Sequence, residues 1–459
     1  MFSSFTFKIG KVMFVKKSQT RLGLFTLIAV LHSAPLQAID LVEVYERALN
    51  EDATFASAKQ ILAAAKLDLP LAKSAFGPLV TVSGGMTLNY NNARQEGSSN
   101  TSYSNVHTQF GLNADKKLID TAVGLDIESA RVAEESAFLT YSVAQQALIQ
   151  RSIVRYLDVL SSMDNQQLAQ REKEAIAKQL DLSTQRLEVG LGTKTDQYDA
   201  IARYEQTKAT LISAQNSVVD DIQNLEELLG TADTLSSDDF RVLSSNKIQY
   251  EVDDSEQWLQ DSITNNKAHQ LAQMRLTAAQ LDFEKTQKLK SFSVDVAGSW
   301  GLSDNSSSAD GFGNRGDSWA IGLSARYPLF QAGTVKLKQE QAGHRLNSAK
   351  SQLEQARRET GRLIRTAQRA VQSNDRQVEA LGQAVIASES ALISKQEGFR
   401  AGVTTNLDVL DGQRDLFRAQ RDYLRSRYDS INAMVDLELA SGGLTAEDLS
   451  TINSWLERI

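Results

Sequence analysis

VGLGTKTDQYD at residues 189–199 and AGVTTNLDVLD at residues 401–411 are two versions of one stretch, and this repeat decides the fold. The second version follows the first by 212 residues (402 − 190). Nearly the same offset, 214 residues (294 − 80), brings the segment that starts at Val80 onto the one that starts at Val294. A repeat at a fixed offset indicates a fold built from equivalent units. We therefore expect an internally duplicated chain whose halves contain the same order of elements.

The first 38 residues have the pattern of a secretory signal peptide. A basic region without acids precedes a short apolar run at residues 22–31, and the segment ends on Ala38, a small residue suited to cleavage. The apolar run is too short to span a bilayer as a helix. The alternative is a buried helix at the edge of a domain. Met13 is an alternative start, because the region before it is long for a signal peptide.

Two segments, residues 80–115 and 291–329, alternate between apolar and polar side chains with the period of β-strands. Each segment predicts a hairpin with strands of about 10–12 residues and aromatic side chains near the strand ends, as in strands that cross a membrane. The alternative is a pair of soluble hairpins with one face on a core. The long polar loops at residues 91–103 and 303–316 disfavour that alternative.

The segments that follow the hairpins predict very long helices. Residues 335–399 contain no proline and carry small or apolar side chains in a heptad pattern. A helix of about 65 residues is roughly 100 Å long, and residues 121–189 have the same character. Each long helix should end at a glycine, Gly190 or Gly402, from which a second helix returns antiparallel.

These patterns divide the chain into five parts. The divisions are a signal peptide at 1–38, a first structural repeat at 39–230 with a tip near 190, an equatorial crossing segment at 231–254, a second repeat at 255–442 with a tip near 402, and a C-terminal short helix at 443–459.

Four strands cannot stand alone in a membrane, because their edges would leave backbone groups unpaired in hydrocarbon. Three copies would supply twelve strands, an ordinary size for a closed barrel. The same copies would bring helical hairpins that close into a second cylinder. The predicted fold class is therefore a mixed α and β membrane protein: a trimeric 12-stranded outer-membrane β-barrel, with four strands per chain, continued by a long antiparallel coiled-coil α-helical barrel.

The chain resembles the TolC family of outer-membrane efflux proteins from Asp40 to about Ser454. The resemblance rests on DLxxVYxxA at 40–48, YPLFxxG at 327–333 and GFxxGxxxxLDVLD at 398–411, in that order. It implies a homotrimer in outer-membrane lipid with a long periplasmic extension. Its implied function is the exit duct of a tripartite efflux pump or a type I secretion system. The implied partners are a periplasmic adaptor (membrane fusion) protein and an inner-membrane transporter driven by ATP or by protons.

Asp408 and Asp411 are the candidate pore constriction. They are three residues apart and so share one helix face, although acids in a first helical turn are also favoured by the helix dipole. The resemblance implies that three copies of each surround the lumen at the tip, where carboxylate rings select cations. We expect their first-half equivalents, Asp196 and Asp199, on the outer hairpin and away from the pore.

The resemblance also implies a latch that closes the tip by polar links between hairpins. Phe399 and Thr404 stand where better-known family members carry Tyr and Arg, and they cannot form the same links. Lys194 and Arg400 are the candidate substitutes.

The two tips are also candidate contacts for the adaptor. The tip residues are Gly190, Leu191, Gly192, Gly402 and Val403. The turns alone explain the glycines, but they do not explain an exposed apolar side chain beside each turn. A helical hairpin of a partner could cover these side chains.

Other function classes have little support in the sequence. The chain has no cysteine, its four histidines lack a metal-ligand spacing, and its net charge is −8. We therefore expect no enzyme, no cofactor, no metal and no nucleic acid. The alternative function is a periplasmic or outer-membrane coiled-coil scaffold or adhesion protein without a channel; the heptads fit it, but four matched strands do not. The cargo, small molecules or protein, stays open.

Overall fold

The computed structural model describes residues 39–93, 101–230, 235–237, 240–244, 255–307 and 314–457. The chain separates into two compact units, Met1–Gln37 and Ala38–Ile459, and every described residue lies in the second. Within these ranges, no helix combines the length and the apolar character that crossing a membrane requires. The predicted signal peptide and most of the two hairpin loops lie outside the described residues.

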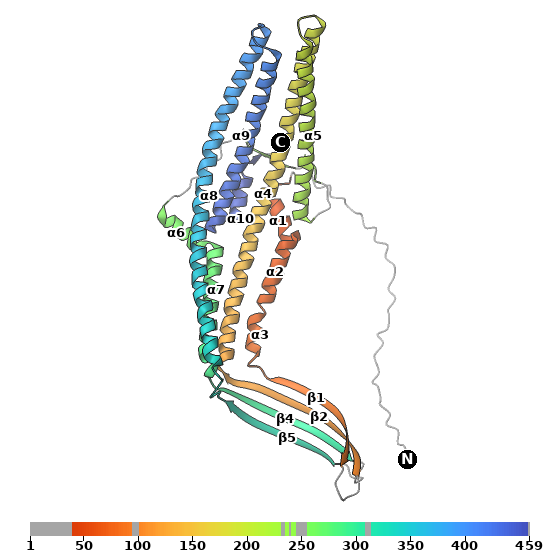
Figure 1. Cartoon of the computed structure of the whole chain (residues 1–459), viewed down its shortest axis with the longest axis vertical. Helices are drawn as coiled ribbons and strands as arrows, with labels where there is room; N and C mark the ends of the chain where they lie inside the picture. The colour runs from red at the N-terminus through yellow and green to blue at the C-terminus, as the bar shows by residue number, and fades with distance from the viewer. Residues whose placement is uncertain are drawn as a thin grey trace, which may run out of the picture. The chain divides into compact units, whose positions relative to one another are not determined.

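The two halves of the second unit repeat one order of elements (Figure 1). The first half contains α1 (Leu41–Glu51), α2 (Ala53–Ala65), α3 (Asp68–Ser74), β1 (Leu79–Ala93), β2 (Thr101–Asp120), α4 (Thr121–Glu188) and α5 (Lys194–Leu229). The second half contains α6 (Glu256–Asn265), α7 (Lys267–Gln287), a 3-10 turn (Lys288–Lys290), β4 (Ser293–Ser307), β5 (Asn314–Arg326), α8 (Thr334–Arg400) and α9 (Asn406–Ser441). Each half is thus short helices, a β-hairpin and a long helical hairpin.

The two β-hairpins join into one antiparallel sheet in the order β1-β2-β4-β5. Alternate side chains on one face are apolar and exposed: Met86 is 73%, Trp319 74% and Ile321 75% exposed. Both outer strands, β1 and β5, have an edge without a partner in the described sheet. The sheet therefore has an apolar face and two backbone edges that the described chain does not cover.

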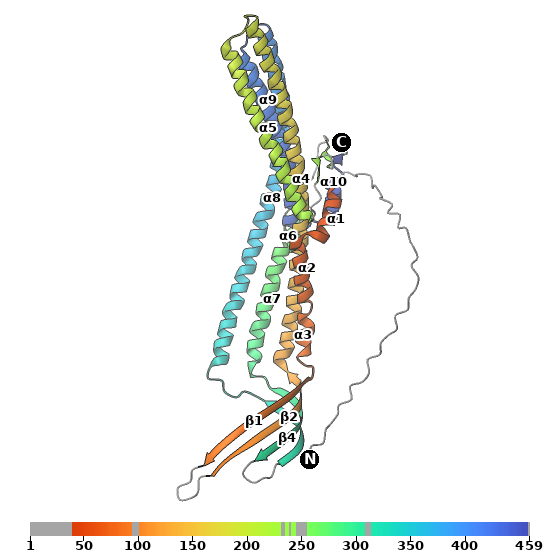
Figure 2. The ribbon, with the colours of Figure 1, turned by 90° about the vertical axis from the view of Figure 1, so that its right-hand side faces the viewer.

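Long helices continue from the strands without a break in direction of the chain. Asp120 ends β2 and caps α4, accepting a hydrogen bond from the Ala122 amide at 3.0 Å. Near the sheet, α7 lies between α4 and α8, while α2 and α3 lie along the other side of α4 (Figure 2). At the far end, α4 and α5 form one helical hairpin and α8 and α9 form the other (Figures 1 and 2).

The largest apolar core lies midway along α4, where short elements pack around it. Leu148, Ile153 and Tyr156 of α4 are fully buried there, together with residues of α1, α5 and α9. The Tyr156 hydroxyl donates a hydrogen bond to the Ile39 carbonyl at 3.1 Å and accepts one from the Arg241 amide at 3.3 Å. Burial is the main cause that raises the pKa of Tyr156, to about 12. The start of the described chain is thereby tied to the crossing segment.

The C-terminal segment differs from the single short helix expected at 443–459. Helix α10 spans Ala446–Asn453, and a two-residue strand, β6 (Leu456–Glu457), follows it. Strand β6 pairs with β3 (Val242–Leu243) of the crossing segment. The helix ends because Leu456, only 6% exposed, is drawn into the core beside β3, a tertiary contact that local helix propensity does not register.

Candidate functional site at the helical tips

The two helical tips have the same local structure, as the sequence repeat predicts. Gly190 and Gly402 end the long helices with φ angles of +78° and +77°, a conformation that suits glycine because it has no Cβ atom. The return helix then begins at a threonine cap, Thr193 for α5 and Thr405 for α9. Each threonine forms a reciprocal capping box with the acid three residues later.

Asp408 is held in one of these caps. Its Oδ2 accepts hydrogen bonds from the amide and the hydroxyl of Thr405 at 2.8 and 2.6 Å. These hydrogen bonds, together with the nearby charge of Lys395, hold the pKa of Asp408 below its ordinary value. The carboxylate is therefore fully charged at neutral pH. Its equivalent, Asp196, makes the same cap with Thr193, so capping alone does not distinguish the two tips.

Asp411 instead connects the two helical hairpins. Its Oδ1 lies 3.5 Å from Nη2 of Arg203 on α5 and 3.0 Å from Nη1 of Arg414 on its own helix. Farther from the tip, Arg421 of α9 pairs with Glu172 of α4 at 3.1 Å. The acid that the sequence singles out for the lumen thus has a cationic partner on the other hairpin.

A buried amide strengthens the same connection. Asn406, 2% exposed at the start of α9, accepts a hydrogen bond from Nε2 of Gln179 at 2.6 Å. Its own Nδ2 donates to the Asp196 carbonyl at 3.0 Å. We refer to three contacts, Asn406 with Gln179, Arg203 with Asp411, and Arg421 with Glu172, as the inter-hairpin seam. Sequence reasoning missed the seam, since it treats Asn406 only as part of the tip signature.

The latch candidates do not meet one another. The Phe399 ring lies under the Arg186 guanidinium of α4, 4.4 Å from its carbon to the ring centroid, which is a cation–π contact between the hairpins. Thr404 donates to the Lys395 carbonyl, and Arg400 pairs with Glu397, both within the second hairpin. Within the described part of the chain, Lys194 forms no ion pair. Arg186, which the sequence analysis did not select, is the residue that reaches Phe399.

The tips carry exposed apolar side chains beside their turns. Leu191 is 72% and Val403 79% exposed. Both residues follow a glycine that turns the chain, so their side chains project from the ends of the hairpins. This geometry leaves them available to a partner.

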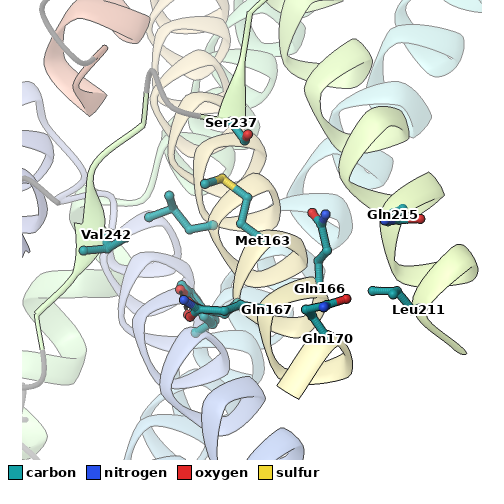
Figure 3. Close-up of a pocket in the computed structure, with 11 residues that line it drawn as sticks. Met163, Gln166, Gln167, Gln170, Leu211, Gln215, Ser237 and Val242 are labelled. Carbon is teal, nitrogen blue, oxygen red and sulfur yellow. Dashed lines mark hydrogen bonds between the residues drawn. The ribbon is translucent and has the colours of Figure 1, made fainter. Parts of the chain in front are cut away.

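A separate pocket lies between α4, α5, α9 and the crossing segment, and its volume is about 430 Å³. Amide side chains of α4 face α5 across it (Figure 3). The residues drawn include Gln166, Gln167, Gln170, Gln215 and Met163. Asp164 also lines it and accepts a hydrogen bond from the Tyr428 hydroxyl at 2.6 Å. Among the described residues, no group of three or more potential ligands could hold a metal ion.

Asp164 provides a test of this polar interior. Burial raises the pKa of Asp164, against the opposing effect of the Tyr428 hydrogen bond. As pH rises from the ordinary value through the folded pKa, the unfolded chain releases this proton first, and folded stability falls. Asp164→Asn should therefore raise the thermal unfolding midpoint at pH 7, with no gain below the ordinary carboxyl pKa. Asp164→Ala is the control, because it leaves the Tyr428 hydroxyl without an acceptor and should lower the midpoint.

Comparison with known proteins follows the same division into halves. Residues 44–231 and 258–443 match the family model described as "Outer membrane efflux protein". The chain is 26% identical over 428 residues to "Outer membrane protein TolC" of Vibrio cholerae serotype O1, which covers 93% of this chain and 95% of the relative. It is 21% identical over 442 residues to "Proteases secretion protein PrtF" of Dickeya chrysanthemi, covering 95% of each.

The fold also matches solved channel structures. The structure of CusC, described by its authors as a study of folding and transmembrane channel formation, superposes with a TM-score of 0.75. Sequence identity is 17%, and the match covers 88% of this chain and 92% of that one. At this identity the likeness establishes the fold. The predicted combination of a long helical part and a β part in each chain is confirmed.

Proposed function

We propose, since the chain belongs to the outer membrane efflux protein family, that three copies of it form one exit duct through the outer membrane. The family is one of channel proteins rather than enzymes. The exit duct serves efflux or type I secretion, in agreement with the relatives named TolC and PrtF. The observation that carries the proposal is the four-stranded sheet, which has one exposed apolar face and two open edges.

Closure by further copies satisfies both of these features. An open sheet edge in hydrocarbon leaves backbone donors and acceptors unpaired, each at a cost of several kcal/mol. Strands β1 and β5 run in opposite directions, because three antiparallel pairings separate them. The β5 edge of one copy can therefore pair antiparallel with the β1 edge of the next, and three copies make a ring of twelve strands.

The helical layer supports the same neighbour relation. On the α8 side of the chain, Leu337 is 65% exposed; on the α2–α3 side, Ile61 is 58% and Leu71 64% exposed. These apolar side chains lie on the two outer helices of the layer α2/α3, α4, α7, α8, the same two sides that β1 and β5 bound. Adjacent copies would bury both sets as the ring closes, which supports a helical cylinder below the strands.

Within this duct the helical tips form the periplasmic entrance. Asp408 and Asp411 of three copies would line its narrowest point, while the inter-hairpin seam and the Arg186–Phe399 contact hold it closed. The exposed Leu191 and Val403 would contact the helical hairpin of a periplasmic adaptor. An inner-membrane transporter, coupled through the adaptor, supplies the energy, since the family's duct has no cofactor of its own to do so.

The direct test is the mass and conductance of the protein extracted from membranes in detergent. We expect a trimer by mass measurement in detergent and discrete single-channel steps after reconstitution into planar bilayers, because one chain cannot close its own sheet. A monodisperse monomer would contradict the proposal. Release from membranes by salt alone would instead indicate the scaffold function that the heptads also fit.

A further inference from the structure

The strand register of the sheet is staggered at one position only. Leu79, the first residue of β1, pairs with Asp115, five residues before β2 ends at Asp120 (120 − 115). Across the rest of the sheet the corresponding ends are flush, since Asp120 pairs with Ser293 and Ser293 pairs with Arg326. The stagger of the described sheet is thus confined to the boundary between β1 and β2.

The paired residues define a path across the whole chain. From Leu79 the path runs through Asp115 and Ala297 to Gly322 on β5. Gly322 lies four residues before the end of β5 at Arg326 (326 − 322). The irregularity between Lys117 and Ile119 accounts for the change from five residues to four. One chain therefore contributes a displacement of four residues along the strands.

A closed barrel restricts what the next boundary can add. A path perpendicular to the strands returns to its starting strand displaced by the shear of the barrel. In a three-fold ring each copy supplies one third of that shear. The displacement per copy must also be even, because apolar side chains occupy even positions on β1, such as Met86, and odd positions on β5, such as Trp319. The total shear is then a multiple of six.

The strand tilt selects one multiple. With a rise of about 3.4 Å per residue and strands about 4.8 Å apart, twelve strands tilt by about 35° for a shear of about 12 and by about 47° for a shear of about 18. Membrane barrels tilt their strands by about 35–45°. A shear of about 12 is four residues per copy, the displacement that the chain already contains. The boundary between copies should then add none.

We infer that β5 of one copy pairs with β1 of the next in flush register, with Arg326 opposite Leu79 of the neighbouring copy. This inference rests on the proposed trimeric duct and specifies its interface. All 13 residues of β5 then have a partner. Trp319 faces Met86, a favourable ring–sulfur pair. A register moved by two residues would instead set Gly322 against Gly85, leaving a gap between two residues without side chains.

Paired cysteines test the register, because the chain contains no cysteine of its own. The flush register sets Ser318 opposite Thr87 of the neighbour, and the shifted register sets Ser318 opposite Asn89. In the full-length protein, Ser318→Cys combined with Thr87→Cys should give covalent dimers and trimers on a non-reducing gel. Ser318→Cys with Asn89→Cys is the matched control on the same strand face and should link poorly. Within one chain, three strand spacings of about 4.8 Å separate β1 from β5, beyond the reach of a disulfide.

The outcomes distinguish the register from the duct itself. Efficient linking of the Asn89 variant in place of the Thr87 variant would overturn the flush register and leave the trimer intact. Linking of neither variant in complexes of trimer mass would overturn the pairing of β5 with β1. Loss of the trimer in the unmodified protein would contradict the proposed function instead. A second pair, Ser324→Cys with Thr81→Cys, should link in the flush register and repeats the test near the helical end of the strands.

Discussion

The double change Asp408→Ala, Asp411→Ala is expected to raise single-channel conductance several-fold and to weaken cation selectivity. Three copies would remove six carboxylates from the narrowest part of the duct, and such rings favour cations and repel anions. Block by multivalent cations should weaken as well, since these ions bind best where carboxylates converge. Planar-bilayer recording of reversal potentials and block measures all three effects.

The first tip supplies a matched control for this experiment. Asp196→Ala, Asp199→Ala removes the same number of charges and the same kind of helix cap, because Asp196 and Asp408 form equivalent capping boxes. Its effect on conductance should be much smaller if the first hairpin lies away from the lumen. Equal effects of the two double variants, or none from either, would reduce Asp408 and Asp411 to helix-start residues.

Asn406→Ala is expected to lower stability by about 1–3 kcal/mol, since it leaves the buried Gln179 amide without its acceptor. It also removes the hydrogen bond to the Asp196 carbonyl, so it loosens the start of α9 from the first hairpin. We therefore expect longer or more frequent high-conductance openings together with a lower thermal unfolding midpoint. Both quantities can be measured on the same purified protein.

Gln197→Ala is the control for the seam. Gln197 donates to Thr184 at 3.3 Å, and both residues belong to the first hairpin. Its loss removes a tip hydrogen bond of similar chemistry without separating the hairpins. If Asn406→Ala conducts like the unmodified protein, the seam stabilises the chain but has no part in gating.

Much of the fold follows from periodicity in the sequence. The alternation around residues 80–115 and 291–329 predicts two hairpins, and the structure joins them in one sheet. The heptads predict helices of the length seen in α4 and α8. The tip turns are also legible, because Gly190 and Gly402 meet a local backbone requirement. Local rules suffice for these features since each depends on neighbours within a few residues.

The inter-hairpin seam was beyond such reasoning. Asn406 meets Gln179 across 227 positions of sequence, and no spacing rule connects them. The Arg186–Phe399 contact is similar, since substituting Phe for a polar residue predicts the loss of one link but not the cation that replaces it. Strand β6 was missed because it depends on burial of Leu456 rather than on strand propensity.

The most direct test of the trimeric duct is single-particle imaging of the unmodified protein in lipid nanodiscs. We expect three-fold symmetry, a closed ring of twelve strands within the lipid and a minimum radius at Asp408 and Asp411. The β5 and β1 strands of adjacent copies should be continuous in density. A particle without the three-fold axis, or a ring whose narrowest point lies far from these acids, would contradict the duct or its gate, respectively.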